Sequence, residues 1–385
     1  MFMLEKAMVG SRRYWSWVVF LLLLAAFGLV FYLRQLSYGL GITGMSRDVS
    51  WGIYIAQFTF FVGVAASAVM VLLPYYLHDV QQFGKITLLG ELLAVSAVTM
   101  CMLFIFVDMG QPMRVLNVLL YPTLSSLMFW DLVSLGGYLL LNAVIAMAML
   151  NSEYKGVPAP TWTKPLILLS IPWAVSIHTV TAFLYNGLAG RSLWFTAVLA
   201  PRFLASAFAS GPALMILLCL ALRRLTSFDA GQEAIRRLGI IVTYAMTVNV
   251  FFLLLELFTS LYSHVPEDAK PFAYLFFGLE GKHGLVPLMW LSSALAVAAL
   301  IALLVPGLRR KESVLALAAV FVFLSLWLEK GLGLIVAGFV PSPLGDVTPY
   351  APTGPEWAIV SGIWAIGALM ITVFYKITVS IREAN

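Results

Sequence analysis

Charge is what this sequence lacks most. Only 11% of its 385 residues are Asp, Glu, Lys or Arg, and 62% are hydrophobic, whereas a soluble domain has about 25% charged residues. Well inside its long apolar runs we find only three side chains that can carry charge at neutral pH: Glu91, His178 and Glu256. We expect no cage of acidic and basic residues, no run of intramembrane arginines and no ladder of histidines. The composition predicts a helical membrane bundle whose chemistry depends on very few polar groups.

Cysteine and histidine are scarce as well. The two cysteines, Cys101 and Cys219, are too few and too far apart in sequence for an iron–sulfur cluster or a zinc site. A b-type haem generally needs two buried histidines, and only His178 lies inside an apolar run. We therefore expect neither haem nor metal. The net charge of +5 is interpreted as a sign of membrane topology and not of nucleic-acid binding.

The fold predicted is all-α, with about ten transmembrane helices in one integral membrane domain over residues 1–385. The first apolar run lacks a small-residue cleavage site, so it is interpreted as a retained span and not as a signal peptide. The first span at 14–34 and the last at 357–379 flank an expected eight-helix core at 52–338. The runs of spanning length are 14–34, 52–77, 87–107, 124–150, 164–188, 203–222, 239–263, 284–305, 314–338 and 357–379.

Both termini are predicted to be cytoplasmic, in a chain that spans the cell membrane many times. Ten spans place the two chain ends on one side, and most of the 23 lysines and arginines fall in the segments on that side. Lys and Arg accumulate in cytoplasmic loops. The opposite loops, beginning with residues 38–50, are richer in Gly, Pro and aromatic residues, as expected of a docking surface on the outer side.

The second predicted span opens with aromatic residues. Asp48 or Ser50 is expected to cap the helix, which places Trp51 and Tyr54 about one turn apart on one face at the outer boundary. The pair fits either an aromatic belt at the membrane interface or a wall on which a flat lipophilic ring stacks. Gly63 and Ser67 have the spacing of small residues that lets helices approach closely.

His178 is expected in the middle or outer half of the fifth span. Thr181 and Tyr185 follow three and seven residues later, so they share its helix face. A neutral histidine can bond to a carbonyl oxygen of a ligand and, with its pKa near neutrality, exchange a proton. The alternative is a histidine tied to a neighbouring backbone carbonyl.

Two carboxyl groups lie within other predicted spans. Glu256 shares a face with Asn249 and Ser260, and Glu91 lies in the inner half of the third span with Thr99 two turns further out. A carboxyl in hydrocarbon favours its neutral form and is suited to passing protons. The alternative is a neutral carboxyl that bonds to a neighbouring helix.

Charged residues also gather at the predicted outer edge. Asp108 and Arg114 flank a Gly/Pro turn, and Asp131 is expected at the membrane interface. The outer edge also carries Arg191, Arg202 and Lys330, which could contact a docked partner or lipid phosphates.

Three segments together resemble the NrfD/polysulfide-reductase (PsrC-like) membrane-subunit family, most like its ten-helix DsrP/HmcC type from sulfate-reducing and sulfur-oxidising prokaryotes. These segments are Trp51–Ala56 with the Gly63, Ala65 and Ala66 helix, Asp108–Arg114, and His178 through Ala213. The resemblance implies two four-helix bundles plus flanking helices, without haem or metal. It also implies a quinone site near the outer face, beside an extracytoplasmic, ferredoxin-like iron–sulfur subunit.

The function expected from this resemblance is electron exchange between menaquinone or menaquinol and the iron–sulfur subunit. The setting would be a DsrMKJOP-like complex of sulfur metabolism, with cytochrome c and further membrane and cytoplasmic redox subunits as additional partners. A secondary transporter of a small solute or ion is the alternative.

The residues predicted for these roles form three groups. The quinone headgroup is expected near Trp51, Tyr54, Asp108, His178 and Glu256. A proton path to it is expected along Glu91, Thr99, Asn249 and Glu256. A partner interface is expected at Arg47, Asp48, Arg114, Arg191 and Arg202.

Overall fold

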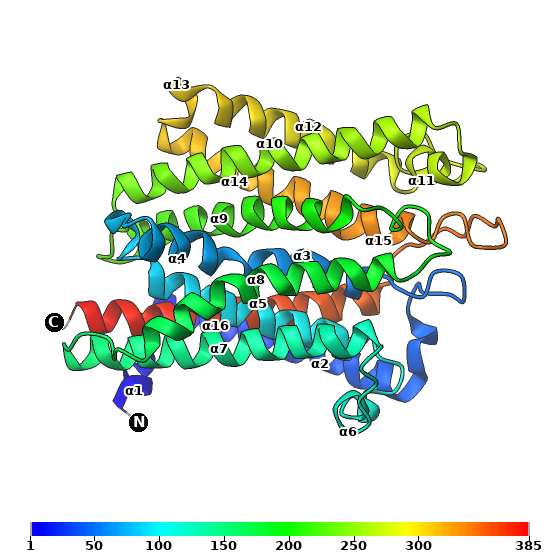
Figure 1. The fold of residues 1–385 in the computed structure, drawn as a ribbon. Helices are drawn as coiled ribbons and strands as arrows, with labels where there is room; N and C mark the ends of the chain where they lie inside the picture. The colour runs from blue at the N-terminus through cyan, green and yellow to red at the C-terminus, as the bar shows by residue number, and fades with distance from the viewer. Residues whose placement is uncertain (1, 384–385) are drawn as a thin grey trace.

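The computed structural model describes residues 2–383, and they form a bundle of nearly parallel and antiparallel helices (Figure 1). Ten helices are long and apolar enough to cross a membrane, and the described residues contain no β-strand beyond one isolated bridge between Leu279 and Lys282. The prediction of an all-α bundle with ten spans is confirmed. Both chain ends lie at the same end of the bundle, which we call the inner end; the opposite end is the outer end.

The spans correspond to these elements: α2 (Arg12–Tyr38), α3 (Ile53–Ala65) with α4 (Ser67–Leu77), α5 (Thr87–Asp108), α7 (Leu127–Lys155), α8 (Thr163–Asn186), α9 (Leu199–Leu225), α10 (Gln232–Tyr262), α12 (Val286–Leu304), α14 (Glu312–Leu326) with η4 (Trp327–Gly333) and α15 (Leu334–Ala337), and α16 (Gly354–Arg382). The short elements are α1 (Phe2–Met8), η1 (Gly39–Ile42), η2 (Gln81–Phe83), η3 (Pro112–Arg114), α6 (Asn117–Leu120), α11 (Pro266–Phe276) and α13 (Pro306–Arg309).

The core consists of two groups of four spans. The first bundle contains α3 with α4, α5, α7 and α8, each in contact with the next along the chain. The second bundle closes into a ring, because α9 packs on α10, α10 on α12, α12 on α14, and α14 on α9. In Figure 1 the second bundle lies above the first.

The first and last spans form a pair outside the two bundles. Helices α2 and α16 pack along each other, and α16 also contacts α5. Gly28 and Gly362 allow this close approach, because a methyl group added to Gly28 would lie 2.7 Å from the Cα of Gly362. Without a hydrophobic drive between helices in lipid, such close packing of small residues holds helices together.

Small residues also join the two bundles. A methyl group on Gly211 of α9 would lie 2.9 Å from the Cα of Ser67, and one on Gly63 of α3 would lie 3.2 Å from Ser210 Oγ. The predicted close approach at Gly63 and Ser67 is thereby confirmed. The second span contacts α5, α8, α9 and η4, so it lies between the bundles.

Two spans depart from a regular α-helix. The second breaks at Ala66, between α3 and α4, and the hydroxyl of Tyr138 on α7 donates to the freed carbonyl of Ala65 at 3.3 Å. The ninth contains the wide π-helical turn η4, whose seven residues include Glu329 and Lys330. Both irregular segments are buried, as expected where non-helical backbone is shielded from lipid by protein.

The second span begins later than predicted. Helix α3 starts at Ile53, with Gly52 before it and no side-chain cap from Asp48 or Ser50. The amide of Ile53 instead donates to the hydroxyl of Tyr350 at 2.7 Å, from the loop before α16. A distant tyrosine thus caps this helix, which a local sequence pattern cannot indicate.

Candidate functional site

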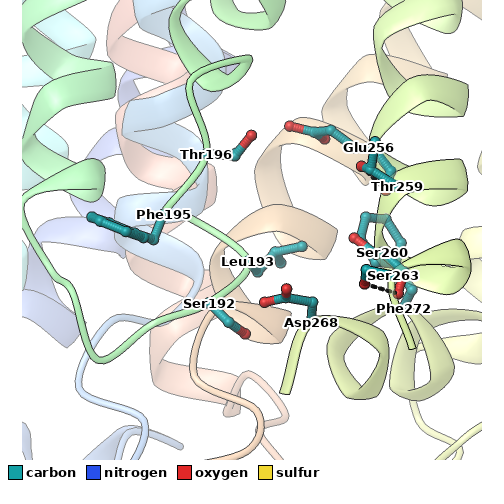
Figure 2. A pocket seen from close by; sticks show the side chains of 10 residues that line it. All are labelled: Ser192, Leu193, Phe195, Thr196, Glu256, Thr259, Ser260, Ser263, Asp268 and Phe272. Atoms are coloured by element: carbon teal, nitrogen blue, oxygen red, sulfur yellow. Dashed lines mark hydrogen bonds between the residues drawn. The ribbon is translucent and has the colours of Figure 1, made fainter. Parts of the chain in front are cut away.

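A polar cavity opens at the outer end of the second bundle. It has a volume of about 220 Å³ and lies between α10, α11 and the loop that leads into α9. Figure 2 shows its lining side chains, with the Glu256 carboxyl directed across the space toward Thr196. The cavity is lined by Ser192, Leu193, Phe195, Thr196, Glu256, Thr259, Ser260, Ser263, Asp268 and Phe272.

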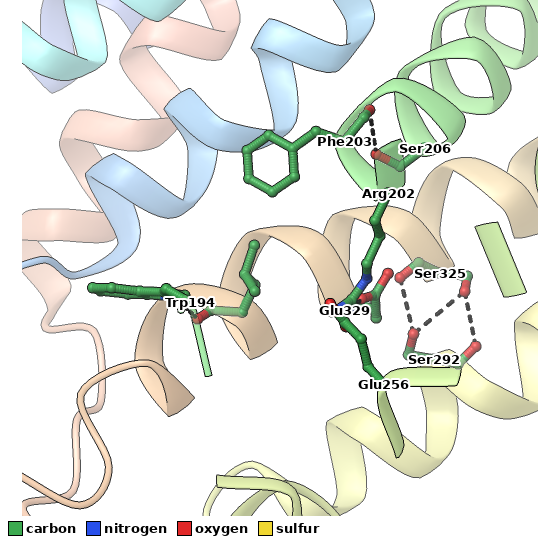
Figure 3. Close-up of polar contacts among 9 residues, drawn as sticks. Trp194, Arg202, Phe203, Ser206, Glu256, Ser292, Ser325 and Glu329 are labelled. Atoms are coloured by element: carbon green, nitrogen blue, oxygen red, sulfur yellow. Dashed lines mark hydrogen bonds and ion pairs between the residues drawn. The ribbon is translucent and has the colours of Figure 1, made fainter. Parts of the chain in front are cut away.

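Glu256, which lines this cavity, also belongs to a buried ionic cluster. The guanidinium of Arg202 on α9 donates to the carboxylates of both Glu256 on α10 and Glu329 on η4 (Figure 3). All three residues are at most 6% exposed. We call Arg202, Glu256 and Glu329 the acidic–basic triad. It binds three helices of the second bundle together through charge-assisted bonds.

The triad contradicts three expectations from the sequence. Arg202, assigned to a partner interface at the outer edge, is buried and bonded inside the bundle. Glu329 was missed as an intramembrane charge, and a cage of acidic and basic residues does exist. The predicted ninth span, 314–338, already contained Glu329, but its basic partner Arg202 comes from α9, and a local sequence pattern does not show that contact.

Lys330 is buried next to the triad but extends toward the first bundle. Its ammonium donates to the carbonyl of Phe203 at 3.4 Å and lies 4.4 Å from the centre of the Phe203 ring. A methyl group on Gly63 would lie 3.3 Å from Lys330 Nζ, so the ammonium reaches α3. Lys330 is only 4% exposed, contrary to its expected position at the outer edge.

His178 is completely buried on α8 in the first bundle. Its Nδ1 lies 2.7 Å from the carbonyl oxygen of Ala174. Because a carbonyl only accepts, Nδ1 must carry the proton in this contact. In the neutral ring Nε2 is then an acceptor; it makes no hydrogen bond of standard geometry within the described residues, although the Val62 backbone lies close to the ring. The expected alternative, a bond to a backbone carbonyl, therefore accounts for one ring nitrogen and leaves the other free.

Two hydrogen bonds between side chains lie on the outer side of His178. Thr181 donates to the Asp131 carboxyl at 2.7 Å, and the hydroxyls of Tyr185 and Thr59 lie 2.5 Å apart. The predicted face of His178, Thr181 and Tyr185 is buried throughout. Asp131 is only 4% exposed, so it is an interior residue and not an interfacial one.

Trp51 and Tyr54 point to different partners. Trp51 precedes α3 and packs against Tyr185 and Trp194, with ring centres 5.5 Å away in each case. Tyr54 is fully buried and donates to Gln35 on α2 at 2.7 Å. The prediction of a shared helix face was wrong because the helix begins only at Ile53.

Asp108 lies at the outer end of α5, in the same region as Tyr54. It follows Val107, whose carbonyl accepts from Gln35 at 2.6 Å, and its Oδ1 is buried without a partner among the described residues. Of the five residues predicted for a quinone site, Trp51, Tyr54, Asp108 and His178 thus belong to the first bundle and its outer end. Glu256 belongs to the second.

The predicted proton-path residues are not brought together as one string. Glu91 is completely buried on α5, and neither of its carboxyl oxygens has a partner among the described residues. Thr99, two turns outward, donates to the carbonyl of Val95 at 2.8 Å. Asn249 lies in the second bundle on α10, with its Oδ1 also unpartnered in the described part of the chain.

The remaining predicted interface residues lie toward the outer end. Arg47 and Arg114 are exposed, and Asp48 accepts from Thr348 at 3.1 Å. Arg191 donates to the carbonyl of Phe339 at 3.2 Å and lies over its ring. Burial lowers the pKa of the Arg191 guanidinium, and the nearby Asp48 carboxylate opposes that shift.

Comparison with known proteins identifies a family and several relatives of this chain. The family model described as "Polysulphide reductase, NrfD" matches residues 41–340. A putative membrane subunit of a dimethyl sulfoxide reductase from Halobacterium salinarum is 27% identical, over 92% of this chain and 89% of its own length. A selenate reductase subunit from Mesobacillus selenatarsenatis is 23% identical, over 91% and 90%. An Hdr-like menaquinol oxidoreductase integral membrane subunit from Archaeoglobus fulgidus is 24% identical, over 70% and 67%.

Proposed function

This chain belongs to the polysulphide reductase, NrfD family of multi-pass membrane proteins, and we propose that it is the quinone-reactive membrane subunit of a multi-subunit oxidoreductase. The relatives support this, since they are named as subunits of dimethyl sulfoxide and selenate reductases and of a menaquinol oxidoreductase. Menaquinone or menaquinol is the proposed substrate. An extracytoplasmic iron–sulfur subunit is the proposed electron partner.

The observation that carries the proposal is the free Nε2 of buried His178. With Nδ1 held by the Ala174 carbonyl, Nε2 is fixed as an acceptor in an apolar interior. It can therefore accept a hydroxyl proton as a quinol is oxidised, and return it when a quinone is reduced. The separate hydrogen-bonded pairs Thr181–Asp131 and Tyr185–Thr59 offer hydroxyl and carboxyl groups between His178 and the outer end.

Access to His178 requires movement of aromatic side chains. His178 and Tyr54 are both 0% exposed. Trp51, Tyr185 and Trp194 pack against one another at the outer end of the space between the bundles. We propose that these aromatic side chains move apart to admit a quinone ring, which then stacks on them. Trp51 and Tyr54 then serve as walls, with Asp108 near the outer mouth.

The proton path is proposed for the inner half of the first bundle only. Glu91 is buried with two unpartnered oxygens, and Asn142 Oδ1 and Ser67 Oγ are buried without partners as well, within the described residues. Buried polar atoms of this kind are commonly satisfied by ordered water. Water between them would link Glu91 to the inner end, which is where a proton supply from the cytoplasm would arrive.

The narrower assignment to a DsrMKJOP-like complex of sulfur metabolism is proposed on the sequence resemblance alone. It predicts that cytochrome c and further membrane and cytoplasmic redox subunits purify with this chain. Affinity purification from native membranes, followed by identification of the co-purified subunits, tests it.

The quinone assignment is tested by photolabelling of the intact complex with an azido-quinone. We expect label on α3 and α8 near His178, and we expect added menaquinone to compete for it. In a His178→Ala complex the label should decrease, whereas the matched variant His264→Ala, an exposed histidine on the outer face, should label like the parent. Label confined to lipid-facing helices, with no competition, would refute the assignment.

A further inference from the structure

We propose that the cavity at the outer end of the second bundle binds a small monovalent cation, held by the Glu256 carboxylate and the hydroxyl oxygens around it. The cation is Na⁺, coordinated by these oxygens, or a proton, bonded to Glu256 Oε1 alone; the second measurement below distinguishes the two. This site is separate from the proposed quinone site, because Glu256 lies in the second bundle and His178 in the first.

The first argument is an unpaired carboxylate oxygen. Glu256 is only 5% exposed, and its Oε2 bonds to Arg202. Its Oε1 is buried and has no partner among the described residues. Glu256 is also the triad member that lines the cavity, and Figure 2 shows its carboxyl directed into the space. A buried carboxylate oxygen without a partner is costly, and a cation or a proton would satisfy it.

The second argument is the charge balance of the triad. Two carboxylates share the single guanidinium of Arg202, which leaves one negative charge uncompensated if both carboxyls are ionised. Lys330 does not correct this, because its ammonium bonds to the Phe203 carbonyl and lies on the side of α3. Asp268 on α11 adds a further carboxylate at the mouth. Among the described side chains that line the cavity, none is basic.

The third argument is the orientation of the hydroxyl groups. Ser192 donates its proton to the carbonyl of Glu267 at 2.7 Å, and Thr259 donates to the carbonyls of Leu255 and Glu256, each at 3.0 Å. Ser263 donates to the carbonyl of Ser260 at 3.2 Å. Because the single proton of each hydroxyl is used on the backbone, lone pairs remain on Ser192 and Thr259 for another donor or a cation, while Ser263 already accepts from the Val265 amide at 3.3 Å. A cavity lined by such acceptors favours a positive ligand.

These observations also indicate the charge of the ligand. The buried triad lacks one positive charge, and oxygen ligands suit hard cations such as Na⁺. A divalent ion would leave the buried cluster with a net positive charge, unless Asp268 at the partly exposed mouth also bound it. We therefore expect binding of one monovalent cation from the outer aqueous phase.

The experiment is Na⁺ binding to the purified complex in a sodium-free buffer, measured with radioactive sodium and by calorimetry. We expect saturable binding that weakens as the pH falls, because protons compete for Glu256. Glu256→Gln should weaken binding by at least about tenfold, equivalent to about 1.4 kcal/mol. Glu329→Gln should also weaken it, because one carboxylate then balances Arg202. Glu233→Gln, an exposed carboxylate on the same helix, should bind like the parent.

A second measurement distinguishes the proton from Na⁺. If Na⁺ does not bind, infrared spectra of the same complex should contain a protonated-carboxyl band that disappears in Glu256→Gln and remains in Glu233→Gln. Absence of both Na⁺ binding and this band would overturn the proposal. So would Na⁺ binding that is unchanged in Glu256→Gln, or a clear preference for Ca²⁺ over Na⁺. None of these results depends on quinone turnover, so they test the cavity independently of the proposed function.

Discussion

The two bundles of this protein solve the same problem in different ways. Both carry polar side chains in a setting where an isolated charge costs several kcal/mol. The first bundle uses hydrogen bonds without a basic partner, such as Tyr185 with Thr59 and Thr181 with Asp131. The second uses full charges that meet at Arg202.

The difference indicates what each bundle is suited to do. Neutral hydroxyl and imidazole groups can gain or lose a proton without breaking an ion pair, which fits chemistry on a redox ring. The triad instead holds α9, α10 and η4 in place and exposes one carboxylate oxygen to a polar cavity. The first bundle is thus the place to look for proton-coupled electron transfer, and the second for a bound cation.

The largest expected effect is on stability in the second bundle. Arg202→Met leaves two buried carboxylates without their cation, and breaking a buried ion pair in this way costs about 3–5 kcal/mol. We expect loss of assembled complex or a much lower midpoint of thermal unfolding in detergent. Arg191→Met is the matched control for the unfolding midpoint, because Arg191 bonds one carbonyl at the outer end. An Arg202→Met protein as stable as the control would show that the triad does not hold the bundle.

The next largest effect is expected on activity in the first bundle. His178→Ala removes the free Nε2 acceptor and should lower quinol-linked electron transfer at least tenfold, about 1.4 kcal/mol of barrier. Complex assembly should remain, since the lost contact is one bond within α8. Steady-state turnover of the assembled complex measures this, with His264→Ala as control. Parent-like turnover in His178→Ala would remove this histidine from the reaction.

A smaller, more specific effect is expected from Glu91→Gln. The amide keeps the shape of the side chain but cannot exchange a proton, so the charge moved across the membrane per electron should fall if Glu91 carries protons. Proteoliposomes that report charge displacement during turnover provide the measurement, and Glu233→Gln is the control. Equal charge per electron in parent and Glu91→Gln would mean that protons exchange directly with the outside.

The smallest effect is expected from Tyr185→Phe. This change removes a neutral hydrogen bond to Thr59 while keeping the ring contacts with Trp51 and Trp194. A bond of this kind contributes about 1 kcal/mol, so the unfolding midpoint should fall slightly. Measuring the unfolding midpoints of Tyr185→Phe and Arg202→Met side by side compares the stabilising contacts of the two bundles. A loss as large as that of Arg202→Met would indicate that neutral and ionic contacts stabilise the bundles equally.

The features that could be predicted are those set by local patterns. Ten apolar runs of membrane length became ten spanning helices, because in lipid each such run must satisfy its own backbone. The spacing of His178, Thr181 and Tyr185 correctly placed them on one buried face, since the period of an α-helix fixes that relation.

The features that were missed depend on contacts between distant segments. Arg202 directly precedes its predicted span and Lys330 lies in the outer part of another, so both were assigned to the outer edge, yet their partners come from other helices. The sequence did contain an indication of the triad. Glu256 lies within a span, and a carboxylate inside a membrane usually pairs with a basic group nearby. Trp51 was misplaced for a related reason, because the start of α3 is fixed by Tyr350, almost three hundred residues later along the chain.

The wide turn η4 also sets the rotational phase of the ninth span. A π-turn takes up one residue more than an α-turn, and each α-helical residue rotates the chain by about 100°. Because the extra residue is absorbed within Trp327–Gly333, the next segment keeps the orientation in which the Leu334 carbonyl accepts from the Trp194 indole at 2.9 Å. Glu329 and Lys330, neighbours in this turn, have different partners: Glu329 bonds to Arg202, whereas Lys330 contacts Phe203 and lies near Gly63 of α3. We therefore expect a change in the length of this turn to disturb the Trp194 contact more than a substitution among its apolar residues.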